Sequence, residues 1–144
     1  VKINRGKFIK FDNGNEIHFS EKYKKHLGRA IDYLVLPDFS FNKESNDIKD
    51  ILFPQLSARA DSKITIYSIP NKSDDTFASI FFQKNNNFKI YEYPWNIITE
   101  RDKDWVDNRI MYIGKINFMK EYECMFPGTN RHSKIISLID KSST

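Results

Sequence analysis

Residues 31–36, IDYLVL, constrain the fold of this chain more than any other stretch. The run is nearly continuous in apolar character and has the length of one strand. Strands of this kind are usually buried on both faces, as they are in parallel sheets. Pro37 and Asp38 follow at once, so an acid stands at the carboxyl end of the strand. We therefore expect a buried central strand that presents a carboxylate at its tip.

Further elements on both sides of this strand can be assigned from periodicity and turn residues. Residues 7–19 alternate apolar and polar side chains around Asp12-Asn13-Gly14, which is a β-hairpin signature. Residues 43–58 follow a helical period, although Pro54 is expected to kink or end that helix. We also expect strands at 63–69 and 88–93, with a loop at 85–87. A helix is expected at 102–113 and is stopped by Gly114. A second helix, capped by Asn117, should run to Met125 and be followed by a turn at Gly128 and Asn130. Residues 76–83 fit either a helix or a strand.

The order of these elements predicts the fold class. Strands that alternate with helices indicate an α/β protein with three layers around a mostly parallel sheet, preceded here by an N-terminal β-hairpin. The length of 144 residues suits a single domain spanning 1–144, with no internal repeat and a polar, frayed tail at 140–144. The first residue is Val and not Met, which we interpret as a sign that the chain is a piece of a longer protein.

Composition limits the class of protein. A hydrophobic fraction of 40% is enough for a core, and no apolar run approaches the length of a membrane span, so no membrane partner is expected. The net charge of +4 permits a nucleic-acid partner. Cys124 stands alone, which fits a core thiol in a reducing compartment, and the three histidines lack zinc-type spacing. The densest basic patch consists of Lys22, Lys24, Lys25, His26 and Arg29, for which a solvated face is the alternative interpretation.

Asp38 and Ser68 are the first candidates for a functional site. In open parallel sheets, ligands bind outside the carboxyl ends of the strands. Asp38 would stand at one such end and Ser68 at the end of a neighbouring strand, just before Pro70. An acid and a hydroxyl on adjacent strand tips suit a nucleotide–magnesium site, where the carboxylate holds the ion or orients water and the hydroxyl senses the phosphate. The structural alternative is that Asp38 only caps the helix that follows.

A magnesium-dependent nuclease is a second interpretation of the same acid. Pro37-Asp38 followed by Asp61-Ser62-Lys63 fits the loose pattern P-D…(D/E)-x-K, in which two acids bind magnesium and the lysine helps to activate water. Lys63 begins its strand, however, whereas this chemistry wants the D-x-K set inside one strand. A phosphate-binding loop of the G-x-x-x-x-G-K-[ST] type is absent from the sequence, and the five glycines are too scattered to build one.

Several segments occur in an informative order. A D-N-G hairpin, FDNGNEIHF (11–19), precedes Gly28-Arg29 and the strand IDYLVLPDFSF (31–41). They are followed by SKITIYSIPN (62–71), PWN (94–96) and FMKEYECMFPGT (118–129). In this order the segments resemble the second half of the ATPase domain in the large terminase subunit of tailed bacteriophages, the ATP-driven motor that packages viral DNA into procapsids. The resemblance covers nearly the whole chain, to about residue 137.

The resemblance implies a fold and roles for particular residues. It implies part of a P-loop-type (ASCE-like) three-layer domain, in which the strand before Asp38 is the Walker B strand and Ser68, Pro70 and Asn71 belong to the coupling motif. Asp38 would be the catalytic acid and would help to hold Mg²⁺ with ATP. The family places two consecutive acids here, whereas this chain has Pro37 in the first position and the shorter Asp in place of the usual Glu. The Walker A and nuclease segments of the family are absent from the chain.

Partners follow from the same resemblance. They are double-stranded DNA, the remaining terminase segments, the portal protein and the small terminase, in a ring of subunits in the host cytoplasm. Arg29, with Lys22, Lys24 and Lys25, would contact phosphate or DNA, and a structural salt bridge of Arg29 is the alternative. ATP hydrolysis is expected only with a partner or segment that supplies Walker A. A fragment, one chain of a split terminase, and an inactive paralogue acting as a non-catalytic assembly or interaction protein all stay open.

Overall fold

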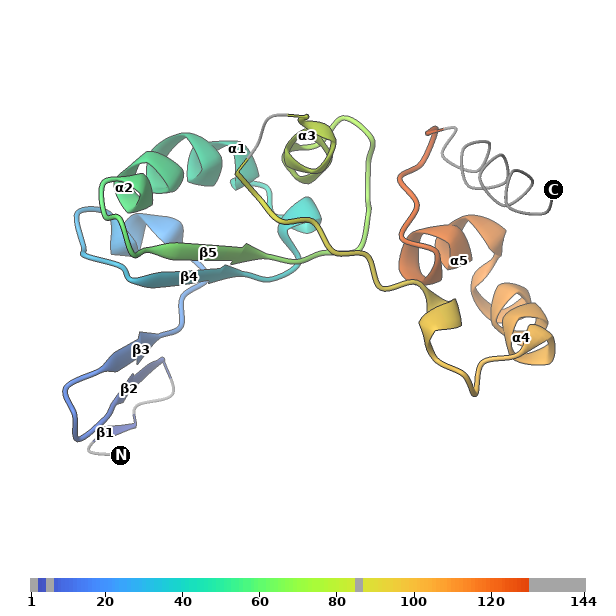
Figure 1. Ribbon diagram of the computed structural model, residues 1–144, viewed down its shortest axis with the longest axis horizontal. Coiled ribbons are helices and arrows are strands. Elements are labelled where there is room, and N and C mark those ends of the chain that lie inside the picture. Colours follow the sequence, from blue (N-terminus) through green and yellow to red (C-terminus); the bar gives the residue numbers. More distant parts are fainter. Residues whose placement is uncertain (1–2, 5–6, 85–86, 130–144) are drawn as a thin grey trace, which may run out of the picture.

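A computed structural model of the chain describes residues 3–4, 7–84 and 87–129, which form a mixed α/β structure (Figure 1). The expected turn at Asn130 and the expected tail at 140–144 lie outside these residues, as do positions 85 and 86 of the expected loop. A small antiparallel sheet and a parallel pair of strands are the two sheets of the described structure. In that part of the chain, no helix is both long enough and apolar enough to cross a membrane.

The predicted hairpin is confirmed. Strands β2 (Phe8–Lys10) and β3 (Glu16–His18) pair antiparallel with Ile9 opposite Ile17, and β1 (Ile3–Asn4) adds a third strand beside β2. Gly14 adopts a φ of 88°, a left-handed conformation that a side chain would disfavour. The turn chemistry read from the sequence therefore sets the register of this sheet.

Strands β4 (Tyr33–Leu36) and β5 (Lys63–Ile66) form the predicted parallel pair. Their register places Tyr33 opposite Lys63 and Leu36 opposite Ile66, so both strands end at the same edge. The chain returns from one strand to the other through the helical segment between them, as parallel neighbours require.

The predicted helix at 43–58 forms as one continuous helical segment with a change of hydrogen-bonding pattern before Pro54. It consists of α1 (Ser45–Asp47), the π-helical turn η3 (Ile48–Leu52) and α2 (Phe53–Ser57). Proline lacks an N–H donor and its ring crowds the preceding turn. The wider π turn is the usual local adjustment to such a disruption.

The core lies between this helical segment and one face of the parallel pair. Phe39 is completely buried, and Leu52 is 1% exposed. The buried members of this core are Tyr23, Phe39, Ile48, Leu52 and Ile80. The strands contribute Leu34, Leu36 and Ile66, which pack against these residues.

The other face of the parallel pair is open, which corrects the prediction that the 31–36 strand is buried on both faces. Tyr33 is 58% exposed, Val35 44% and Tyr67 54%. Helices α1, α2 and α3 (Thr76–Phe82) lie on one side of the pair (Figure 1), and nothing among the described residues covers the opposite side. The third layer of the expected fold is therefore not formed by the described residues, and the finer P-loop-type assignment stays a prediction.

The prediction of a strand at 88–93 is wrong, because this segment has no ladder partner in the described structure. Phe88 packs its ring 5.8 Å from that of Phe53, which anchors the segment on α2. Tyr91 and Tyr93 are 60% and 70% exposed and stack on each other. Alternation of side chains signals a half-buried extended segment, whereas a strand also needs a neighbouring backbone.

The ambiguous stretch at 76–83 is a helix, α3, and it begins where Asp75 accepts a hydrogen bond from the Ala78 N–H at 2.8 Å. The predicted helix at 102–113 is confirmed as α4 (Lys103–Ile113). Gly114 ends α4 with a φ of 79°. Between α3 and α4 lies a short 3-10 turn, η4 (Trp95–Ile97).

Helix α5 (Lys115–Tyr122) corrects two details of the sequence prediction. Asn117 is not its cap but lies in its first turn, where the side-chain amide donates to the Ile113 carbonyl at 2.9 Å. The helix ends before Met125, and Cys124 follows it with a φ of 54° instead of lying in a helix. Because Gly114 ends one helix and starts the next, no residue is left between them for a separate cap.

Replacing Leu52 by Ala should destabilise the protein by about 2–5 kcal/mol, because it leaves a cavity between η3 and the strands. Ile51→Ala is the matched control, since Ile51 is 43% exposed on the same turn and should cost much less. Urea unfolding followed by circular dichroism measures both changes. Equal losses at the two positions would contradict the position of the core.

Candidate functional site

Asp38 stands alone at the tip of β4. It adopts a left-handed backbone conformation with φ 48° and ψ 37°, which aspartate tolerates better than most residues. It occupies the position before the 3-10 turn η2 (Phe39–Phe41), yet its side chain makes no capping hydrogen bond, so the helix-cap interpretation is wrong. Its exposed carboxylate has no hydrogen bond or ion pair within the part of the chain that the structure describes. The acid is therefore free to meet a ligand.

Ser68 lies beside this tip, as the sequence predicted. Its hydroxyl accepts a hydrogen bond from the Ser40 N–H at 3.1 Å and donates to the Ile69 carbonyl at 3.0 Å. The ladder also continues past the strands, because the Tyr67 N–H donates to the Leu36 carbonyl at 3.1 Å. The residues just after β4 and β5 are thus held together by backbone and hydroxyl hydrogen bonds.

Ser40 and Asp75 complete this junction, and sequence reasoning missed both. The Ser40 hydroxyl donates to Asp75 Oδ2 and accepts from the Asn71 N–H at 3.2 Å. The same carboxylate oxygen accepts from the Lys72 N–H at 3.2 Å. An acid directly before an apolar run is a helix-start signal that would have found Asp75 as the cap of α3. Its bond to Ser40 joins residues 35 apart, so only the tertiary structure reveals that bond.

We call Ser40, Ser68, Asn71 and Asp75 the strand-tip network. It connects the segment that carries Asp38 to β5 and to the first turn of α3. Pro70 is buried next to it, which fixes the chain as it leaves β5. A shift of the η2 turn would therefore be transmitted to the start of α3 through side-chain hydrogen bonds.

A metal site made by protein groups alone is not found here. Among residues 3–4, 7–84 and 87–129, no three His, Cys, Asp or Glu side chains gather closely enough to hold an ion. Mg²⁺, however, usually keeps several waters and takes one or two carboxylates together with substrate phosphates. Asp38 fits such a role as a single carboxylate, provided that a nucleotide supplies the phosphates.

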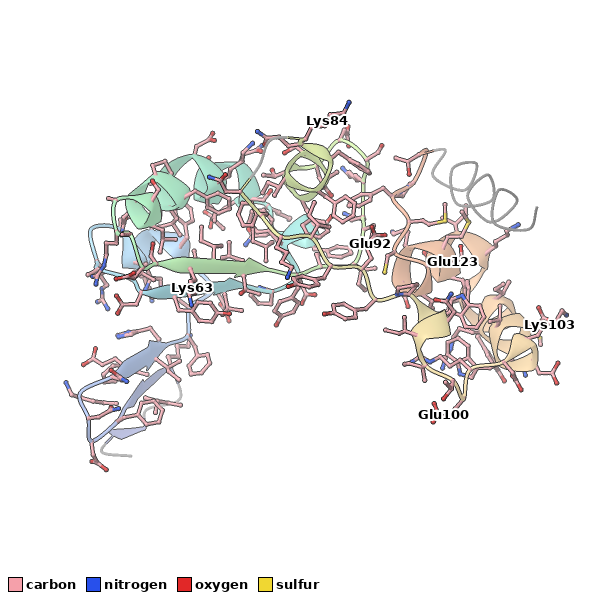
Figure 2. The ribbon with its side chains drawn as sticks, viewed as in Figure 1. Lys63, Lys84, Glu92, Glu100, Lys103 and Glu123 are labelled. Carbon is pink, nitrogen blue, oxygen red and sulfur yellow. The ribbon has the colours of Figure 1, made fainter. Side chains whose placement is uncertain are left out.

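The nuclease constellation is not brought together. Lys63 lies opposite Tyr33 at the beginning of the parallel pair, whereas Asp38 follows the end of β4. Figure 2 shows Lys63 towards the end of the pair where the strands begin. Strand β4 alone extends roughly 10 Å from Tyr33 to Leu36, and Asp38 lies beyond its end. Asp38, Asp61 and Lys63 therefore do not form one site in this structure.

The predicted phosphate-contacting cations lie elsewhere. Lys22, Lys25 and Arg29 line a hollow of about 260 Å³ where the hairpin meets the 3-10 turn η1 (Tyr23–His26), and no residue of the strand-tip network lines it. Lys24 is not among the lining residues, because its ammonium lies 5.8 Å from the centre of the Tyr23 ring. Arg29 makes no ion pair within the described chain, so the salt-bridge alternative is not supported.

Comparison with known proteins adds no family to this geometry: no protein-family model, no curated protein and no solved structure matches the chain. Function is therefore inferred from the chemistry of the strand tips and from the order of the segments.

Asp75→Ala should lower the free energy of unfolding by about 0.5–2 kcal/mol, because α3 loses its cap, and further because Ser40 loses its acceptor. The neighbouring exposed Asp74 is the control, and Asp74→Ala should have little effect. Thermal unfolding compares the two variants. An equal response from both would show that the strand-tip network does not contribute to stability.

The half-buried His26 gives stability a pH dependence. Burial, then Arg29, His18 and Lys25, lower the pKa of His26 from its usual value near 6.5. Between the lowered pKa and 6.5 the unfolded chain binds more protons than the folded one, so stability falls as pH falls through this window. His26→Gln should flatten the decline in urea midpoint between pH 7 and pH 5. An unchanged slope would assign the pH dependence to other groups.

Proposed function

We propose that this chain is the second half of the ATPase domain of a large terminase subunit, part of the motor that packages viral DNA. The observation that carries the proposal is the pair of strand tips: a free carboxylate, Asp38, lies just after the end of β4, and a hydroxyl, Ser68, lies just after the end of the adjacent parallel strand β5. These are the positions at which the resemblance puts the catalytic acid and the coupling motif. Two segments that are distant in the sequence meet at one edge of the pair, and this proximity supports the proposal.

In this function Asp38 orients or activates the water that attacks the terminal phosphate. The strand-tip network is suited to the coupling step, because Ser40 and Ser68 tie the acid's own segment to α3. Nucleotide hydrolysis at the β4 tip would then move η2, and the Asp75 cap would pass that movement to the helix. Rigid hydrogen-bonded elements with two arrangements are the physical means of such coupling.

ATP and Mg²⁺ belong to this proposal only with a Walker A segment that is not in the chain. Bound Mg²⁺ neutralises charge that develops on the phosphates. Pro37 replaces one acid, so Asp38 would be the single protein carboxylate near the ion. The remaining positions would be filled by water and by phosphates that the Walker A segment holds.

The open face of the parallel pair supports the need for such a partner. Parallel sheets are normally covered on both faces, yet Tyr33, Val35 and Tyr67 are exposed here. Further strands and helices from other terminase segments would cover this face and complete the three-layer fold. Double-stranded DNA, the portal protein, the small terminase, a ring of subunits and a place of work in the host cytoplasm are proposed from the resemblance alone.

Mixing the chain with a Walker A-containing terminase segment should produce ATP hydrolysis, measured as phosphate release. Asp38→Asn should lower that rate by about 100-fold or more, which is the size of a general-base contribution. Asp61→Asn is the matched control, because Asp61 is an exposed acid that precedes the opposite end of the pair. Equal rates for the two variants would remove Asp38 from the chemistry.

A non-catalytic assembly protein with the same fold is the second candidate. The observation that favours it is Pro37 in the place of the first acid, together with the short side chain of Asp38. Catalytic geometry tolerates little displacement of a reacting group. A complex that forms with the Walker A segment but never hydrolyses ATP would establish this candidate over the motor ATPase.

A further inference from the structure

A basic hollow lies between the hairpin and η1, and no residue of the strand-tip network lines it. It has a volume of about 260 Å³. Its polar lining comes from three places, namely the start of β2, the end of β3 and the segment that includes η1. The basic and imidazole groups in the lining are Lys7, His18, Lys22, Lys25, His26 and Arg29.

Most positive charges of this hollow have no carboxylate partner among the described residues. Glu21 is the one acid in the lining, against four Lys and Arg side chains. None of those four forms an ion pair within the described chain. Elsewhere in the same structure, Lys10, Arg59 and Lys103 do pair with carboxylates, at 2.7–2.8 Å. Like charges held together without a counter-ion attract an anion from solution.

Contacts with neighbouring side chains orient His18 and Arg29 in the lining of the hollow. Arg29 Nη1 lies 3.4 Å from His18 Nδ1, and since a guanidinium can only donate, that nitrogen accepts. The other ring nitrogen of His18, Nε2, lies 3.1 Å from a carboxylate oxygen of Glu16. These two contacts orient the His18 ring, and His18 in turn orients the Arg29 guanidinium.

The loop that carries Arg29 is anchored to α2 by one side chain. The amide of Gln55 donates to the Arg29 carbonyl at 2.7 Å and to the His26 carbonyl at 3.3 Å, and its oxygen accepts from the Gly28 N–H at 3.2 Å. Three bonds from a single residue preorganise the rim of the hollow. A preorganised set of donors binds an anion with less ordering cost than mobile lysines do.

We propose that this hollow is a binding site for a phosphate group, held by Lys7, Lys22, Lys25 and Arg29. The fork of a guanidinium and the ammonium groups of lysines are the side chains that best match phosphate oxygens. A hollow of about 260 Å³ has room for a phosphate group together with water. The inference that DNA supplies the phosphate rests on the proposed function, whereas the phosphate chemistry does not.

His26 would report the bound phosphate. Its pKa is lowered by burial and then by the electrostatic effect of Arg29, His18 and Lys25. The groups that face it are these three together with Lys7, Lys22 and Glu21 of the lining. A bound anion would offset the cations and raise the pKa of His26, so by linkage the site would bind phosphate more tightly as His26 becomes protonated.

Adjacent lysines supply a matched pair of variants. Lys25 lines the hollow and Lys24 does not, although they are neighbours in η1 and carry the same charge. Lys25→Gln should weaken orthophosphate binding by about tenfold, the loss of one charge-assisted hydrogen bond. Lys24→Gln should leave the affinity within a factor of about two, because it changes only the distant electrostatic field.

The test is a titration of the whole chain with orthophosphate, followed by NMR of the His26 ring over a series of pH values and by calorimetry at one fixed pH. We expect saturable binding and a His26 pKa that rises with phosphate. The site is overturned if the His26 pKa does not respond to phosphate. It is equally overturned if Lys24→Gln and Lys25→Gln weaken binding alike, since that result describes a basic surface without a specific pocket.

A second arm identifies the source of the phosphate. Short duplex DNA is titrated in place of orthophosphate, with the same two variants and with orthophosphate as competitor. DNA binding that falls in Lys25→Gln and is displaced by orthophosphate supports a backbone phosphate as the ligand. Orthophosphate binding without such DNA binding still supports the site and assigns it to a free phosphate or nucleotide. Neither arm needs a Walker A partner, so failure here is distinguishable from failure of the proposed ATPase.

Discussion

Burial of one face of two parallel strands under a single helical segment is the interaction on which the rest of the structure depends. Leu34, Leu36 and Ile66 point from the strands into a core whose centre is Phe39 and Leu52. Apolar burial is non-directional, but it fixes which face of each strand turns inward. Once β4 and β5 are locked in register, their carboxyl ends must lie side by side. The position of Asp38 beside Ser68 follows from that packing.

Hydrogen bonds beside the core hold the turn that follows β4 in place. Ser40 is buried with its hydroxyl between Asp75 and the Asn71 backbone, so that turn has little freedom. Asp38 lies two residues earlier, is exposed, and makes no capping hydrogen bond to the turn. A rigid turn that carries a free acid suits chemistry on a ligand brought by another segment. A turn that carries only one acid suits a non-catalytic assembly protein instead. Pro37, which stands in the position of the missing acid, is therefore the residue on which the choice between the two proposed functions depends.

The two sites that we propose for phosphate groups lie at two different places in this molecule. A patch that is continuous in the sequence becomes discontinuous in space, because Lys25 faces the hollow while Lys24 lies over the Tyr23 ring. The hairpin contributes Lys7 and His18 to the same hollow, although neither belongs to the patch. The strand tips would act on a nucleotide, whereas the hollow would hold a phosphate without chemistry.

The sequence by itself determined the local elements of this protein. The Asp12-Asn13-Gly14 turn, the two parallel strands and the end of α4 at Gly114 were predictable, because each depends on residues next to one another in the chain. Only the tertiary structure decided that 88–93 joins no sheet among the described residues, that those residues leave one face of β4 open, and that Ser40 meets Asp75. Those outcomes depend on which distant segment is present as a neighbour, and side-chain periodicity carries no information about the neighbour's identity or absence.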